Sequence, residues 1–158
     1  MNDRWHDPAT LRRDHDTALR LLDQQGLVRC MDPHWVAETK RLFLAILLAL
    51  QEAMMESCLS LVYCYDQRQQ PPNIAKYDGY SSVSERLQDG RRVASVGVSV
   101  QALQQGDTYG TLILLHELTH ILKAYPTEHG LEFHRQLNRL IEQFNRCTGG
   151  HIVNDYCR

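Results

Sequence analysis

The stretch LLHELTHILKAYPTEHGLEF, residues 114–133, contains residue types that bind metal ions and activate water. On an α-helix, His116 and His120 would lie on one face, about 6 Å apart along the axis, and could bind one ion. Glu117 would lie beside that face, within reach of a metal-bound water. This H-E-x-x-H spacing predicts two metal ligands and a general base.

Zinc is the metal that this pattern favours, because neutral imidazoles suit a tetrahedral site with one open position. Zinc lowers the pKa of a bound water to about 7, and Glu117 would accept its proton during attack on a carbonyl. The flanking residues are apolar, which predicts a core helix. Burying two histidines and a glutamate there is costly unless a partner or a metal compensates.

A catalytic zinc needs a third protein ligand. His129 follows a turn through Tyr125 and Pro126, and His134 is the alternative histidine. The acidic alternatives are Glu128, Glu132 and Glu142. The longer metzincin pattern is absent, because Lys123 and Pro126 occupy the positions of its glycine and its third histidine.

LLHELTHIL followed by EHGLEF resembles the SprT-like metalloproteases, which include the bacterial SprT proteins and the Spartan proteases. In that family a third histidine follows in an H-G-P-x-F context, and Leu131 stands here in place of the proline. The likeness covers about residues 93–152, including ASVGVSVQAL before the motif and LNRLIEQFNRCTGGHI after it. The resemblance implies zinc bound by His116, His120 and His129, Glu117 as the base, and Phe133 packed under the site.

The resemblance also implies a peptidase, with DNA-associated proteins as one class of substrate. One alternative is a regulatory zincin peptidase with a single dedicated substrate. Another is a zinc-stabilised binding module without turnover. Glu117 argues against that module, because a purely structural zinc site gains nothing from a carboxylate at this position.

The elements that must position these residues are predicted from caps and periodicity. Asp7-Pro8 and Asp32-Pro33 begin two helices, Gly26 and Gly149 follow the ends of the first and the last helix, and Asp89-Gly90 marks a hairpin. The predicted helices are about 8–26, 33–56, 109–123 and 128–147, and a strand is predicted at 59–66. We expect a single α+β domain over residues 1–158, zincin-like and minigluzincin-like, with N-terminal helices, a short mainly antiparallel sheet, the active-site helix and a C-terminal helix.

The segment VASVGVSV alternates valine with small residues, which is typical of a half-buried strand. If it lies at a sheet edge, an extended peptide substrate could bind along it near Val96 by strand addition. An ordinary interior strand explains the pattern equally well. Four residues could stabilise an oxyanion: Tyr109, Tyr125, His134 and His151.

Composition limits the compartment and the partners. The five cysteines are odd in number and form no C-x-x-C pair, which favours reduced thiols in a cytoplasmic protein. The apolar run at 42–50 is too short for the roughly 20 residues of a membrane span. A net charge of −2 gives no general attraction to nucleic acid or to an anionic membrane.

Overall fold

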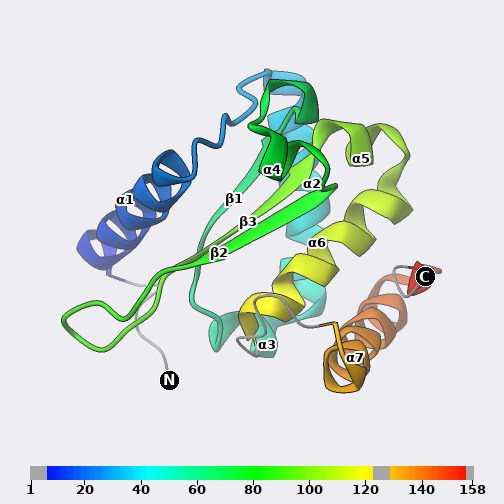
Figure 1. Ribbon diagram of the computed structural model, residues 1–158. Coiled ribbons are helices and arrows are strands. Elements are labelled where there is room, and N and C mark those ends of the chain that lie inside the picture. Colours follow the sequence, from blue (N-terminus) through cyan, green and yellow to red (C-terminus); the bar gives the residue numbers. More distant parts are fainter. Residues whose placement is uncertain (1–6, 123–128, 156–158) are drawn as a thin grey trace.

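The computed structural model describes residues 7–122 and 129–155, and Figure 1 shows its arrangement. Helices and a small sheet occupy separate parts of the chain, which confirms the α+β class. The helices are α1 (Pro8–Gln24), α2 (Pro33–Ala49), α3 (Gln51–Met55), α4 (Pro72–Ala75), α5 (Val100–Gln104), α6 (Asp107–Leu122), α7 (Leu131–Thr148) and the short 3₁₀ helix η2 (Gln67–Gln69). The strands are β1 (Leu59–Tyr65), β2 (Gly79–Val83) and β3 (Ala94–Ser99).

The sheet has the order β1-β3-β2, with β3 in the centre. β3 is parallel to β1 and antiparallel to β2, so the sheet is mixed and the expected mainly antiparallel sheet is wrong. The predicted hairpin around Asp89-Gly90 does join β2 to β3. Because the hairpin inserts β3 between two strands that run in opposite directions, one of its two pairings has to be parallel.

The two faces of the sheet are covered differently. α1 packs on one face, whereas α2 and α6 pack on the other, and α7 lies against α6 (Figure 1). Ala94, Val96 and Val98 point into the larger core with α6. α6, which carries the H-E-x-x-H residues, therefore lies directly on the sheet.

Local signals predicted the ends of several helices correctly. The Asp7 side chain accepts a hydrogen bond from Ala9 N at 3.2 Å, Pro8 opens α1, and Gly26 follows its end with φ +73°. Gly149, with φ +72°, ends α7. These positive angles suit glycine because they cost it no steric strain.

The second helix differs from its prediction. It breaks at Leu50, where φ is −121° and ψ is 39°, and continues as the separate α3. Other elements cover it on one side only: Leu42 and Ile46 are buried, whereas Leu44 and Leu48 are more than half exposed. The apolar run at 42–50 therefore does not mean that other elements cover this helix on every side.

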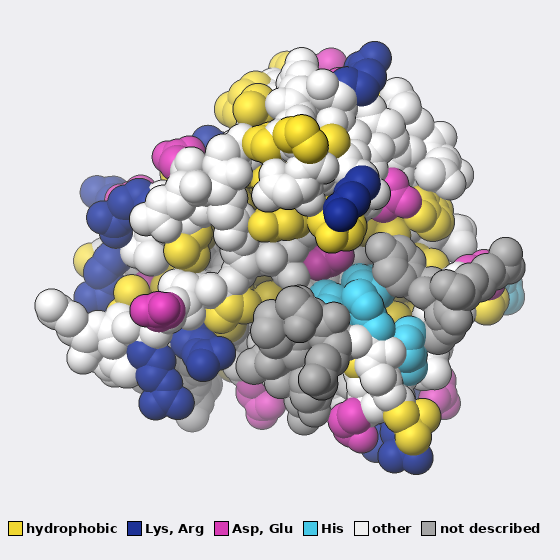
Figure 2. Space-filling model, viewed as in Figure 1, with side chains coloured by type: hydrophobic (Ala, Val, Ile, Leu, Met, Phe, Trp, Pro, Cys, Tyr) yellow, Lys and Arg dark blue, Asp and Glu magenta, His cyan; other side chains and the backbone are white. Residues whose placement is uncertain are grey.

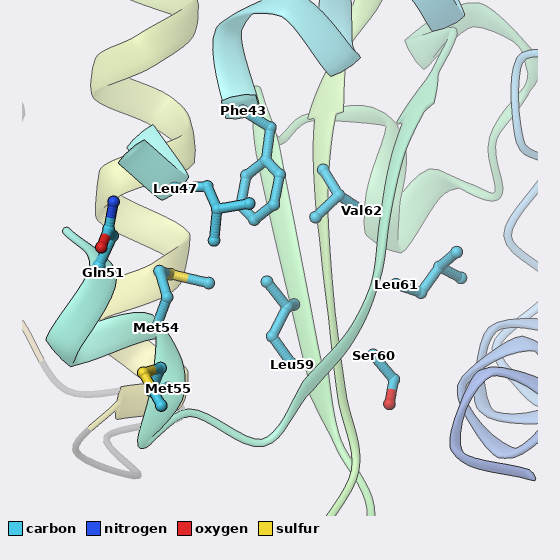
Figure 3. A pocket seen from close by; sticks show the side chains of 9 residues that line it. All are labelled: Phe43, Leu47, Gln51, Met54, Met55, Leu59, Ser60, Leu61 and Val62. Carbon is cyan, nitrogen blue, oxygen red and sulfur yellow. The ribbon is translucent and has the colours of Figure 1, made fainter. Parts of the chain in front are cut away.

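An apolar groove lies between α2, α3 and β1, with a volume of about 560 Å³ (Figure 3). Its lining side chains include no charged group: Phe43, Leu47, Gln51, Met54, Met55, Leu59, Ser60, Leu61 and Val62. This groove offers no acid, no base and none of the usual zinc ligands. Among the described residues, no helix has the length and apolar character that a membrane crossing needs.

β3 is buried along its whole length and hydrogen-bonded on both sides. The Tyr63 ring lies so close to Gly97 that an added Cβ would come within 2.4 Å of its carbons. The small residues of β3 therefore accommodate neighbouring side chains rather than a substrate. A peptide cannot add along Val96, because both edges of this strand are already paired.

Candidate metal centre

α6 carries the H-E-x-x-H residues in a buried setting. Every residue from Gly110 to Ile121 is buried, and the helix contacts β2, β3, α2 and α7. This burial explains why apolar residues surround the motif. It also means that His116, Glu117 and His120 need compensation for the water they lose.

Three imidazole nitrogens converge at one point. The Nε2 atom of His116 lies 3.3 Å from Nε2 of His120 and 3.1 Å from Nε2 of His129. The third side of this triangle, from His129 to His120, is 3.0 Å. Figure 2 shows histidine side chains, in cyan, gathered on one part of the visible surface. The sequence predicted each of the three residues, and the fold brings them together as a group that could hold a metal ion.

Hydrogen bonds among the three imidazoles do not explain this triangle. A neutral imidazole nitrogen either carries a proton or presents a lone pair. Among three nitrogens in mutual contact, at least two are of the same kind, so at least one contact is repulsive. A cation between them accepts all three lone pairs and removes the conflict.

The triangle has the size expected for zinc ligands. Nitrogens about 2.0–2.1 Å from a zinc ion at tetrahedral corners lie about 3.3 Å from one another. The observed sides of 3.0, 3.1 and 3.3 Å are close to that value. The donor set therefore fits a tetrahedral metal with a fourth position left for a ligand.

The surroundings favour the neutral forms of His116 and His129. Burial, reinforced by the neighbouring His120, His129 and His134, lowers the pKa of His116 to about 3. Burial also lowers the pKa of His129, with a smaller contribution from His134. Neutral imidazoles are the form that binds metal ions.

Phe133 forms the floor of the centre. Its ring centroid lies 5.0 Å from that of His116, 4.6 Å from that of His120 and 5.0 Å from that of His129. It is 2% exposed. Because Phe133 belongs to the first turn of α7, it joins that helix to all three histidines as a packing residue, as expected.

Glu117 points towards the neighbouring strand β2. An added Cβ at Gly79 would lie 3.0 Å from Oε1 of Glu117 and 2.9 Å from its Cγ. Burial raises the pKa of Glu117 to about 7, and a hydrogen bond with the Ser81 side chain partly offsets this rise. Sequence reasoning missed Gly79 and Ser81, because β2 carries no motif that links it to a helix much later in the chain.

Comparisons with known proteins give no further assignment. No family model matches the chain, and neither does a curated protein or a solved structure. The interpretation of the centre therefore rests on its own geometry.

The two acidic alternatives that the structure describes lie elsewhere. Glu132 and Glu142 are exposed on α7, where they pair with Arg135 at 3.9 Å and Arg146 at 3.3 Å. Glu128 lies outside the described residues. Neither of the two described glutamates joins the histidine group.

The candidates for oxyanion stabilisation now differ in position. The Tyr109 hydroxyl donates to the Asp78 carboxylate, and His151 is exposed. Tyr125 lies outside the described residues. His134 is close enough to His116 and His129 to influence the pKa of both. Of the described candidates, His134 is the one with an interaction at the centre.

Proposed function

We propose that this chain is a zinc-dependent metallopeptidase of the SprT-like type. The observation that carries the proposal is the convergence of three Nε2 atoms, two of them from the helix that also carries the buried Glu117. His116, His120 and His129 would hold the zinc ion. When bound, zinc would supply a Lewis acid that polarises the scissile carbonyl and makes water acidic.

Glu117 is the proposed general base. Its carboxylate would accept a proton from the attacking water and return it to the leaving amine. The pKa of about 7 applies to the protein chain alone. The charge of a nearby divalent ion lowers the pKa of a carboxyl group and so favours the ionised form that a base requires.

We propose that an extended peptide binds along β2 instead of β3. β2 is an edge strand of the sheet, and α6 packs against it. Main-chain hydrogen bonds to such an edge hold a substrate independently of most of its side chains. Gly79 and Ser81 on this strand lie against Glu117, so a peptide added there would pass near the proposed base.

The decisive experiment compares wild type with Glu117→Gln for zinc content and for cleavage of an unfolded protein substrate. Glu132→Gln is the matched control, because it removes an exposed carboxylate close to the centre. We expect about one zinc per chain in all three proteins. Cleavage should fall about 10²-fold or more only in Glu117→Gln, since general base catalysis contributes about 10²–10⁴-fold.

Each assay is run with and without single-stranded DNA, because the resemblance implies DNA-associated substrates. Stimulation by DNA would support that substrate class, and equal rates would argue against it. Zinc-loaded wild type that cleaves no substrate would favour the non-catalytic binding module. Wild type without stoichiometric metal would contradict both functions.

A further inference from the structure

Two cysteines from distant segments lie side by side. Cys30 precedes α2, and Cys64 belongs to β1. The backbone N–H of Cys30 donates to the carbonyl oxygen of Cys64 at 2.8 Å. The Cys64 Sγ atom lies 3.7 Å from the carbonyl oxygen of Cys30. The spacing of these cysteines in the sequence gives no sign of this contact.

The backbone geometry suits a covalent bond between them. Residues paired by backbone hydrogen bonds in an antiparallel ladder have Cα atoms about 5.5 Å apart. Disulfides usually span Cα distances of about 4.4–6.8 Å. Both cysteines also pack with the same hydrophobic cluster, on the side of the sheet that faces α2. The two sulfurs therefore lie on the same side of the backbone pair.

We propose that Cys30 and Cys64 are a redox modification site, which a small hydroperoxide converts reversibly to a disulfide. The proposal is independent of the proposed peptidase activity, because it uses none of the residues of the metal centre.

The surroundings indicate which thiol reacts first. Both cysteines line a cavity of about 160 Å³, which is large enough for hydrogen peroxide. Cys30 is partly exposed, whereas Cys64 is 2% exposed. Burial raises the pKa of Cys64 to about 11, so Cys64 remains a thiol at neutral pH. Cys30 is therefore the first to react.

The reaction balances in two steps. The Cys30 sulfur attacks one peroxide oxygen and loses its proton, the O–O bond breaks, and the departing hydroxyl takes up that proton as water, which leaves a sulfenic acid at Cys30. The Cys64 sulfur then attacks the Cys30 sulfur, the S–O bond breaks, and the thiol proton leaves with the hydroxyl as a second water. Overall, two thiols and one hydrogen peroxide give one disulfide and two waters. A dithiol reductant reverses the bond.

The test exposes the reduced, folded full-length chain to hydrogen peroxide and maps its peptides by mass spectrometry. We expect one peptide pair joined through Cys30 and Cys64, lighter by two hydrogen atoms than the separate peptides. Dithiothreitol should restore both thiols. Cys58→Ser is the matched control and should still form the bond, because Cys58 is equally half-buried but does not line this cavity.

Cys64→Ser should accumulate a sulfenic acid at Cys30 that dimedone traps, because the resolving thiol is missing. Cys30→Ser should leave Cys64 reduced, and it provides a second variant if Cys64→Ser does not fold. Two outcomes would overturn the proposal. One is a folded wild type in which both thiols still react with an alkylating agent after peroxide treatment. The other is equal trapping of Cys30 in wild type and Cys64→Ser.

Discussion

At the level of single residues, the position of Glu117 depends on residue 79 being a glycine, which has no side chain. Ile113 and Glu117 occupy the space above this glycine, and an added Cβ would lie 2.5 Å from Cγ2 of Ile113. β2 can therefore lie directly against the face of α6 that carries the proposed base. A methyl group at this position would push the strand and the helix apart.

We expect Gly79→Ala to impair cleavage more than metal binding. Overpacking of this kind typically costs about 1–3 kcal/mol of stability. The displaced carboxylate should lower kcat/KM about 10-fold or more, because proton transfer requires hydrogen-bond contact. Gly130→Ala is the control, since an added Cβ there meets no atom of the described residues within 4 Å. Unchanged kcat/KM in a folded Gly79→Ala protein would show that Glu117 tolerates the shift.

A second residue-level prediction concerns His134. Its Nδ1 atom lies 3.4 Å from Nδ2 of Asn154, which orients the ring next to the centre. If His134 stabilises the developing oxyanion, His134→Ala should lower kcat about 10²-fold. Zinc content should stay unchanged, and the exposed His151→Ala should have wild-type activity. Loss of zinc in His134→Ala would instead indicate a role in metal binding.

At the level of elements, Asp66 joins three of them at the end of β1. Its carboxylate caps η2 by accepting from Arg68 N at 3.0 Å, and it accepts from the Gln101 side chain of α5 at 2.8 Å. The Arg68 guanidinium, followed by the hydrogen bond from Gln101, holds the pKa of Asp66 well below its usual value. The Arg68 side chain of this ion pair is largely exposed, so solvent weakens the pair. The hydrogen bonds that Asp66 accepts therefore contribute more to stability than the ion pair does.

We expect Asp66→Ala to lower the free energy of unfolding by about 1–2 kcal/mol at pH 7. A carboxyl group whose pKa is depressed by folding stabilises the protein fully above its unfolded pKa of about 4. That contribution is lost as the pH falls from there towards the lower pKa of the folded state. Urea denaturation should therefore show a difference between wild type and variant that is constant from pH 5 to 7 and shrinks below about pH 4. A difference that grows in acid would contradict this account.

Local sequence predicted elements better than it predicted their arrangement. Asp7-Pro8 and Gly149 determine helix ends through contacts within a few residues, so their roles could be read directly. The order of the strands depends on contacts between distant segments. The valine–small alternation of β3 is the same for an edge strand and for a central strand, because it records only which residues share a face.

In the candidate metal centre too, the sequence predicted the contacts between residues close in the chain better than those between distant segments. His116 and His120 are neighbours on one helix, so spacing alone predicted their joint position. His129 was identified through the HGLEF resemblance, and the structure brings its Nε2 atom to the other two. Gly79 and Ser81 could not be predicted, since only the pairing of β2 with β3 places them beside Glu117.

At the level of the whole molecule, a bound metal would connect α6 with the segment that leads into α7. Two ligands come from α6 and the third from His129, just before α7. Binding to the folded state alone stabilises a protein by about 2.7 kcal/mol at a free ligand concentration 100-fold above Kd. The metal should therefore contribute to global stability.

We expect a chelator to lower the melting temperature of the zinc-loaded protein by about 5–10 °C, as this stabilisation implies for a domain of this size. Differential scanning calorimetry with added zinc or chelator measures the shift. His129→Ala should abolish most of it, because two ligands bind zinc weakly. Equal melting temperatures of wild type in zinc and in chelator would contradict metal binding at this site.

The contact between Gly79 and Glu117 has a consequence for how damage to this protein would appear. The three proposed ligands come from α6 and from the segment just before α7, whereas the proposed base is positioned by a strand that precedes the Asp89-Gly90 hairpin. Metal capture and base alignment thus depend on different contacts. If the proposed function holds, a lesion in β2 or in the hairpin would leave the protein fully metallated but slow to cleave its substrate. Metal content alone would therefore overestimate the competent fraction of a preparation.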